Sequence, residues 1–277
     1  EPLSTPLRRI TLVDDTNSLF RLPPVELEAA EIGLPAFGAN IENAALVEAL
    51  AATARETPGV RMVEGMLGGY ATSEDEIEGR LLGTDERLSA SLLVGADGRG
   101  SQVRAYADVG PREWRYPQTA ITALLRHERP HRQTSTEFHT RSGPCTLVPM
   151  RPLPDSPDGL RHRSSLVWLM SPEEAERRMA LGDAELAEEV EAQVHSLHGR
   201  MALEGPRGAF PMSGLACERL IGERIALVAD AGHFFPPIGA QGLNLGLRDV
   251  AQLIDSLDQY GRTDPGGRKP LSHYDKR

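Results

Sequence analysis

The chain has 277 residues, enough to bury a substantial core in one large domain or two smaller ones. Thirty basic against forty acidic side chains give a net charge of −10, which argues against a nucleic-acid partner. Cys145 and Cys217 fit no metal or redox spacing, and the eight histidines show no ligand spacing, so we expect free thiols and no metal. No apolar run approaches a membrane span and no signal-peptide pattern opens the chain, so we expect a cytoplasmic location.

The N-terminal part predicts short strands around one helix. Residues 9–13 and 18–22 are predicted as two strands separated by a turn-rich spacer. Asn43 is suited to cap a helix that ends before Pro58. A small β-meander is expected next, at residues 60–63, 77–82 and 88–94.

A glycine-containing turn follows the last strand of this meander. Asp97 and Gly98 come directly after an apolar run and precede a helix that starts near Ser101. A carboxylate at a strand end and a serine at a helix start can cap that helix and position the loop between them. Taken alone, the pattern also fits an ordinary β-turn with capping residues.

The middle of the chain predicts a mostly antiparallel sheet with attached helices. Alternating apolar residues predict strands at 119–125, 136–139, 145–150 and 164–169. Pro172, followed by Glu173 and Glu174, predicts the first turn of a helix, because proline and acids suit a helix N-terminus. Residues 185–194 continue the helical pattern.

One stretch in the C-terminal quarter is the most informative. Residues 225–228 predict a buried strand, and Asp230 stands where that strand ends. Its carboxylate should project from the sheet edge at which open α/β sheets bind ligands. Pro236 and Pro237 stiffen the following loop, and apolar residues at helical spacing begin at Leu243. Free N–H groups at that helix start favour an anionic ligand group.

Two motifs together resemble the flavin monooxygenases built like para-hydroxybenzoate hydroxylase. Residues 229–244 match the family's motif G-D-A-x-H-x-x-P-P-x-x-G-x-G-x-N, with Ala229 in place of the first glycine, and residues 92–104 resemble its D-G motif. The resemblance implies that Asp230 holds the ribityl chain of FAD, while N–H groups of the helix start face the flavin pyrimidine. We expect His233 to fix the loop and not to transfer a proton. The implied cofactor-binding residues are Asp97, Asp230, Pro237, Gly239, Ala240, Gln241, Gly242, Leu243 and Asn244.

A shorter match points to a subgroup, the hydroxylases of ubiquinone biosynthesis. Phe138, residues 143–150 and residues 165–168 resemble its order of an aromatic residue, Gly-Pro-x-x-Leu-Leu-Pro-Leu and Ser-Leu-Val-Trp. The resemblance implies an FAD- and NAD(P)H-dependent monooxygenase that hydroxylates a phenolic ring, here a polyprenylated ubiquinone precursor. A peripheral place at the membrane and membership of a membrane-associated biosynthetic complex stay open. No side chain stands out as a general base. The expected apolar substrate pocket is lined by Val148, Met150, Trp168 and Phe235.

The expected fold class is α/β. It combines an incomplete, three-layer, Rossmann-like FAD-binding domain at residues 39–105 and 211–277 with a mostly antiparallel sheet substrate domain at residues 1–38 and 106–210. No G-x-G-x-x-G loop is present, so we expect an internal portion of a longer protein that binds FAD poorly alone. Two alternatives stay open: a hydroxylase of a soluble aromatic or polyketide substrate, and a non-catalytic fragment or scaffold subunit with a flavin-binding fold.

Overall fold

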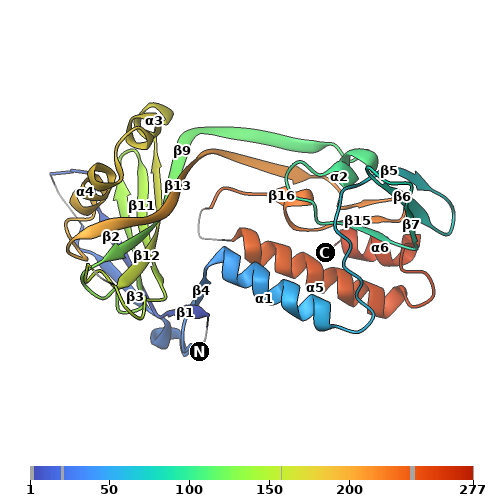
Figure 1. Cartoon of the computed structure of the whole chain (residues 1–277), viewed down its shortest axis with the longest axis horizontal. Coiled ribbons are helices and arrows are strands. Elements are labelled where there is room, and N and C mark those ends of the chain that lie inside the picture. The colour runs from blue at the N-terminus through green and yellow to red at the C-terminus, as the bar shows by residue number, and fades with distance from the viewer. Residues whose placement is uncertain (1–2, 20–21, 157, 238–240, 277) are drawn as a thin grey trace. The chain divides into compact units, whose positions relative to one another are not determined.

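The chain divides into two compact units, each assembled from two segments (Figure 1). The structure is a computed structural model that describes residues 3–19, 22–156, 158–237 and 241–276. Unit 1 comprises Glu1–Met62 and Pro117–Met212, and unit 2 comprises Val63–Tyr116 and Ser213–Arg277.

Residues 39–62 group with unit 1, although the sequence predicted them in the FAD-binding domain. β4 (Gly38–Ile41) pairs antiparallel with β1 (Ser4–Leu7). The Asn40 side-chain amide donates to the carbonyl of Pro149 at 3.1 Å, and Glu42 lies 2.6 Å from Arg163 in an ion pair. These long-range contacts tie the start of α1 (Asn43–Glu56) to the sheet, and local sequence does not encode them.

Unit 1 is built on a mostly antiparallel sheet, as predicted. The described residues give the strand order β13-β9-β12-β11-β10-β2-β3, in which β10 and β2 are parallel. Among the described residues, β16 pairs only with Leu215 and Ala216 at the end of β13, which belong to unit 2 as β16 does. Helices α3 (Pro172–Met179) and α4 (Asp183–Gln193) cover one face of this sheet (Figure 1). The other elements of the unit are β2 (Arg9–Asp14), β3 (Val25–Glu28), η1 (Ala29–Ile32), β9 (Pro111–His127), β10 (Thr134–Thr140), β11 (Gly143–Met150), β12 (His162–Met170) and β13 (Met201–Cys217).

The core of unit 1 lies between this sheet and the two helices. Ile121, Leu125 and Leu166 are fully buried against Leu186 and Val190 of α4. Each such side chain contributes about 1.5–3 kcal/mol by leaving water. The start of α3 agrees with the prediction, because Ser171 caps it by accepting the N–H of Glu174 and Pro172 follows. Both cysteines are free, as predicted, and Cys145 lies in this core, where burial raises the pKa of its thiol.

Three local predictions for unit 1 differ from the structure. The expected strand at 18–22 does not form in its described residues 18, 19 and 22, and residues 20–21 lie outside the description. The Asp14 carboxylate instead turns the chain by accepting the N–H and hydroxyl of Thr16 at 3.1 and 2.7 Å, and β3 becomes the partner of β2. Glu42, not Asn43, is the N-cap of α1, and residues 60–63 are irregular.

Unit 2 has the predicted three layers. β8 (Leu93–Gly95) and β15 (Ile225–Leu227) are parallel neighbours, with β14 (Ile221–Gly222) at one edge. Ile225 and Leu227 face the core that contains Ile77 of the meander, whereas Ala226 faces Leu253 of α5. The other elements of the unit are β5 (Leu67–Thr72), β6 (Ile77–Leu81), β7 (Arg87–Ala90), α2 (Gln102–Tyr106), η2 (Ala229–Ala231), β16 (His233–Phe234), α5 (Gly242–Tyr260) and α6 (Arg268–Asp275).

Candidate functional site

The two predicted motifs meet at one edge of the parallel strand pair of unit 2. Leu93 of β8 pairs with Ile225 of β15, and Gly95 pairs with Leu227. Parallel strands end at the same edge of a sheet, so the loops that carry Asp97 and Asp230 emerge side by side. Ligands bind at this edge in open α/β sheets.

Asp97 caps helix α2. Its Oδ1 accepts the hydroxyl of Ser101 at 2.5 Å, and its Oδ2 accepts the N–H groups of Gln102 and Val103 at 2.8 and 3.3 Å. Ser101 Oγ in turn accepts the N–H of Arg104 at 2.9 Å. The capping role expected from the sequence is therefore present. Contact between Asp97 and a cofactor stays a prediction, because both carboxylate oxygens already hold the loop.

Arg104 joins the two motif loops. Its buried guanidinium donates to the carbonyl of Ala231 at 2.8 Å and to the carbonyl of Arg99 at 2.7 Å. The sequence had given Arg104 no role. The available signal was a cation on a five-residue helix between the apolar neighbours Val103 and Ala105. A buried guanidinium needs acceptors, and here the acceptors are loop carbonyls.

Asp249 of α5 fixes the loop after β15. Its Oδ2 lies 2.7 Å from Nε2 of His233 and accepts the N–H of Ala229 at 2.7 Å. The hydrogen bond with Asp249 raises the pKa of His233, and the charges of Asp249 and Asp230 act in the same direction. His233 therefore anchors this loop, in the role expected for it. Asp249 was missed because its spacing from the motif is meaningful only once α5 folds back on the loop.

Ala229 stands where the family motif has its first glycine. Its φ is +52°, a left-handed conformation that favours glycine, so its Cβ is strained. Gly246 of α5 makes room for it, since a Cβ at Gly246 would lie 2.8 Å from that of Ala229. The sequence suggested only that alanine is small enough for tight packing. The structure adds that its backbone is strained and that Gly246 leaves the space for its Cβ.

The carboxylate of Asp230 is fixed in position but binds no other group of the described residues. It is half-buried in η2, and no described residue forms a hydrogen bond or ion pair with its carboxylate. A fixed carboxylate with free acceptor oxygens fits a ligand that presents hydroxyl groups.

The start of α5 supplies the other half of the site. Gln241 is the N-cap, and Gly242, Leu243 and Asn244 form the exposed first turn. First-turn N–H groups have no partner within their own helix, so they can meet an electron-rich ligand edge. A Cβ at Gly242 would meet no atom of the described residues within 4 Å. Pro237 is exposed, and Gly239 and Ala240 lie outside the described residues.

The four residues predicted to line a substrate pocket do not share one surface. In the pairing of β11 with β12, Trp168 lies opposite Cys145 and Val148 lies opposite Ser165. Val148 is three residues from Cys145 along β11. Directly paired residues share a face and the side-chain period is two, so Trp168 points to the face opposite Val148. Trp168 is in the core beneath the helices, with the Arg178 guanidinium 4.2 Å from its ring centroid. It therefore packs the core and cannot line a pocket with Val148.

The remaining pocket residues have different settings. Met150 lies on the same sheet face as Val148 and is buried. Phe235 belongs to unit 2, where its ring lies 6.1 Å from that of Trp114 and 5.8 Å from that of His233. Substrate contact by Val148 and Met150 stays a prediction. Substrate contact by Phe235, which belongs to unit 2, is a second, independent prediction.

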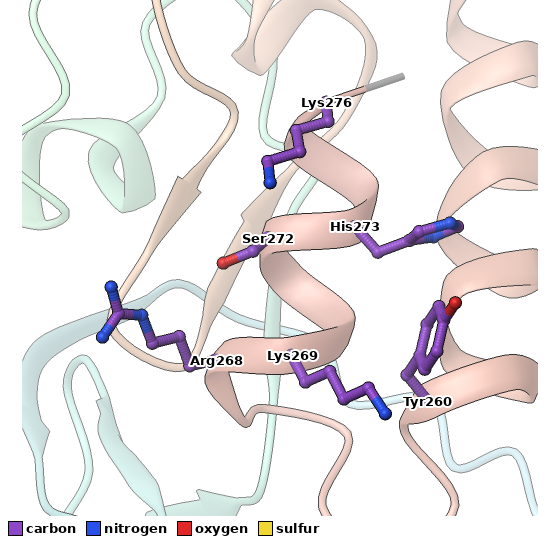
Figure 2. A pocket seen from close by; sticks show the side chains of 6 residues that line it. All are labelled: Tyr260, Arg268, Lys269, Ser272, His273 and Lys276. Atoms are coloured by element: carbon purple, nitrogen blue, oxygen red, sulfur yellow. The ribbon is translucent and has the colours of Figure 1, made fainter.

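A shallow hollow against α6 is a less suitable site. Figure 2 shows Arg268, Ser272 and Lys276 directed to one side of the helix. His273 and Lys269 point to the other side, toward Tyr260 of α5 (Figure 2). The Lys269 ammonium lies 4.6 Å from the Tyr260 ring centroid, where the ring already stabilises its charge. These groups do not converge on one point, and we assign them no ligand.

The described residues contain no group of three His, Cys, Asp or Glu side chains arranged to hold a metal ion. None of their helices is long and apolar enough to cross a bilayer.

Comparison with known proteins shows the family of the chain. The profile of the FAD binding domain family matches residues 41–275, and the chain belongs to this family. It is 32% identical to the ubiquinone hydroxylase UbiL of Rhodospirillum rubrum over 98% of this chain and 61% of that protein. It is also 32% identical to the 3-demethoxyubiquinol 3-hydroxylase of Escherichia coli, over 84% of this chain and 57% of the relative. The chain thus spans about three fifths of these relatives.

A solved structure shares the fold. PqsL of Pseudomonas aeruginosa, crystallised with 2-aminobenzoylacetate, superposes with a TM-score of 0.76 and 20% identity. The match covers 98% of this chain and 72% of PqsL. The predicted flavin-binding fold with an antiparallel sheet is therefore confirmed.

Proposed function

We propose that this chain belongs to an FAD- and NAD(P)H-dependent monooxygenase that hydroxylates the aromatic ring of a prenylated ubiquinone precursor. The observation that carries the proposal is the free carboxylate of Asp230, held at the end of β15 by the Asp249 anchor. Family membership and the names of the two relatives support the cofactor and the substrate class.

In this proposal the chain's own residues bind and orient the cofactor. Asp230 accepts hydroxyl groups of the ribityl chain, in charge-assisted hydrogen bonds worth about 1.5–3 kcal/mol each. The first-turn N–H groups of α5 meet the pyrimidine edge and stabilise negative charge there. Arg104 and Asp249 hold the loops that present these groups. FAD, when bound, supplies the electron transfer and the activation of oxygen.

The substrate side of the proposal rests on the sheet of unit 1. Val148 and Met150 offer apolar surface to a prenylated ring, and no side chain is assigned as a general base. A polyprenyl tail is nearly insoluble in water, so we propose that the protein collects its substrate at a membrane surface. Flotation of the intact protein with vesicles that carry the prenylated phenol tests this part, and a protein that stays at the bottom of the gradient contradicts it.

The activity is tested with the intact protein, FAD and either NADH or NADPH. We expect a prenylated phenol to gain one oxygen atom, detected by mass spectrometry, and a soluble aromatic acid to remain unchanged. Asp230→Ala should release FAD and abolish the product, whereas Asp258→Ala, an exposed acid on α5, should do neither. Hydroxylation of the soluble acid alone would overturn the substrate assignment, and an intact protein without bound flavin would overturn the enzyme assignment.

A further inference from the structure

Unit 1 contains a cavity that the proposed flavin chemistry does not use. It measures about 560 Å³, within the usual range of small-molecule sites, and all of its lining residues belong to unit 1. Its apolar floor is formed by Val13 of β2, Phe138 of β10 and Val194 at the end of α4. Val13 pairs directly with Phe138, so the two share a sheet face. The floor can accommodate a ring or a short chain.

A buried histidine without a protein partner opens into this cavity. His198 is 5% exposed, lines the cavity and forms no side-chain hydrogen bond with any described residue. Its ring nitrogens are not among the enclosed, unpartnered atoms of the described residues, so they keep some exposed surface in a residue that lines the cavity. A buried polar group of this kind needs a partner, and the cavity is where that partner can sit.

The neighbouring histidine holds the His198 ring in place. The rings of His198 and His127 stack with centroids 4.5 Å apart and an interplanar angle of 17°. Both nitrogens of His127 are satisfied, by the carbonyl of Arg129 at 2.8 Å and the hydroxyl of Ser164 at 2.9 Å. Burial lowers the pKa of His198 to about 3, so its ring is neutral and can donate one hydrogen bond.

The rim of the cavity is cationic, although the chain as a whole is strongly acidic. The lining residues include three arginines and only one acidic residue, Glu26. Arg9 is engaged by Glu28 at 2.5 and 3.0 Å. Arg129 donates to the carbonyl of Ser196 at 3.3 Å. Arg132 is exposed, and its guanidinium forms no hydrogen bond or ion pair with the described residues. Arg132 therefore has its donors available to an anion.

The walls that carry these groups are strained. Arg132 and Gln133 have φ of +51° and +60°, and His195 and Ser196 have φ of +53° and +50°. Two pairs of consecutive non-glycine residues in this conformation flank one cavity, and such strain persists where the surrounding structure fixes it. The ring of His131 holds the first pair by accepting the N–H of Gln133 at 3.1 Å while its other nitrogen bonds the carbonyl of Met150 at 3.0 Å.

We propose that this cavity is a second binding site, for a small organic carboxylate with an apolar or aromatic body. The body rests on Val13, Phe138 and Val194, a ring nitrogen of His198 hydrogen-bonds the ligand, and Arg132 pairs with its carboxylate. The site does not rest on flavin binding, since no residue of the two motif loops contributes to it.

Benzoate is the test ligand, with benzamide as its neutral match, titrated calorimetrically into the intact FAD-bound protein. We expect benzoate to bind about tenfold more tightly than benzamide, because a charge-assisted pair with arginine is lost in the amide. Arg132→Gln should weaken benzoate binding by about tenfold, whereas Arg55→Gln, an exposed arginine of α1, should leave it within about twofold.

Two spectroscopic signals distinguish binding in this cavity from binding beside the flavin. The ring resonances of His198 should shift on saturation with benzoate, and the visible absorption of the flavin should not. The proposal is overturned if benzoate and benzamide bind alike, if neither binds, or if benzoate changes the flavin spectrum while the His198 resonances stay fixed. It is equally overturned if Arg132→Gln binds benzoate as the unsubstituted protein does.

Discussion

Nε2 of His233 lies 2.7 Å from Oδ2 of Asp249, and the same oxygen accepts the N–H of Ala229. One carboxylate on α5 thus holds the residues on both sides of Asp230. The raised pKa of His233 favours its cationic form, whose charge offsets those of Asp249 and Asp230. The strand before Asp230 and this anchor after it both fix the loop that carries Asp230.

Asp249→Asn should weaken FAD binding by about tenfold. The substitution keeps the shape of the side chain but removes the charge, and charge-assisted hydrogen bonds are worth about 1.5–3 kcal/mol. Quenching of flavin fluorescence on titration with the intact apoprotein measures the effect, with Asp258→Asn on the same helix as control. An unchanged affinity in Asp249→Asn would show that the loop keeps its position without the anchor.

The same pair predicts a pH dependence on the alkaline side. The folded pKa of His233 is raised above its unfolded value, so its stabilisation is complete below about pH 6.5 and is lost as pH rises through the raised pKa. Urea unfolding of the intact protein should therefore show a decline in stability over that window. Asp249→Asn should flatten this decline, and a slope that survives the substitution contradicts the assignment.

Ala229→Gly should stabilise the protein by about 0.5–1 kcal/mol. Glycine removes the left-handed strain of about 1–2 kcal/mol, and the extra flexibility of its unfolded state offsets part of that gain. Ala231→Gly, two residues away and without positive φ, should destabilise instead, because it loses a buried methyl group. Thermal unfolding distinguishes the two, and a lower Tm for Ala229→Gly refutes the account.

The sequence predicted the parts of the fold that local pattern determines. Alternating apolar residues predicted the strands of unit 1, and the apolar run before Asp230 predicted the buried strand at whose end the two motif loops meet in unit 2. The strand predicted at residues 18–22 does not form in its described residues 18, 19 and 22, because the turn that Asp14 makes with Thr16 overrides the apolar pattern. Trp168 was assigned to the pocket because register, which decides the face of a strand residue, is not a local property.

The residues that hold the loops of the site could not be predicted from local sequence. Arg104 and Asp249 act on main-chain groups of segments 127 and 20 residues away. These partners come together only in the folded chain. The positions of Arg104 and Asp249 relative to the motifs do not indicate a role in the sequence. The motif showed which loop matters, and tertiary structure showed what holds it.

Acidification should destabilise the protein through its buried histidines. Burial lowers the pKa of His127 to about 4 and that of His198 to about 3, so the unfolded chain binds more protons than the folded one. Stability is complete above about pH 6.5 and falls as pH decreases toward 4, by a few kcal/mol in all. Urea midpoints between pH 7 and pH 5 measure the loss. His198→Gln should reduce the slope, and a slope equal to that of the unsubstituted protein would refute the role of burial.

Trp168 and Val148 should separate stability from substrate recognition. Trp168→Phe loses the contact with Arg178 and part of its core packing, so we expect about 1–2 kcal/mol lower stability with an unchanged KM for the prenylated phenol. Val148→Ala lies on the opposite face and is only half-buried, so its stability should change less while KM rises several-fold. Steady-state kinetics beside urea unfolding of both variants gives the comparison. If Trp168→Phe raises KM and Val148→Ala does not, the substrate meets the helix-covered face of the sheet, and the assignment of faces must be reversed.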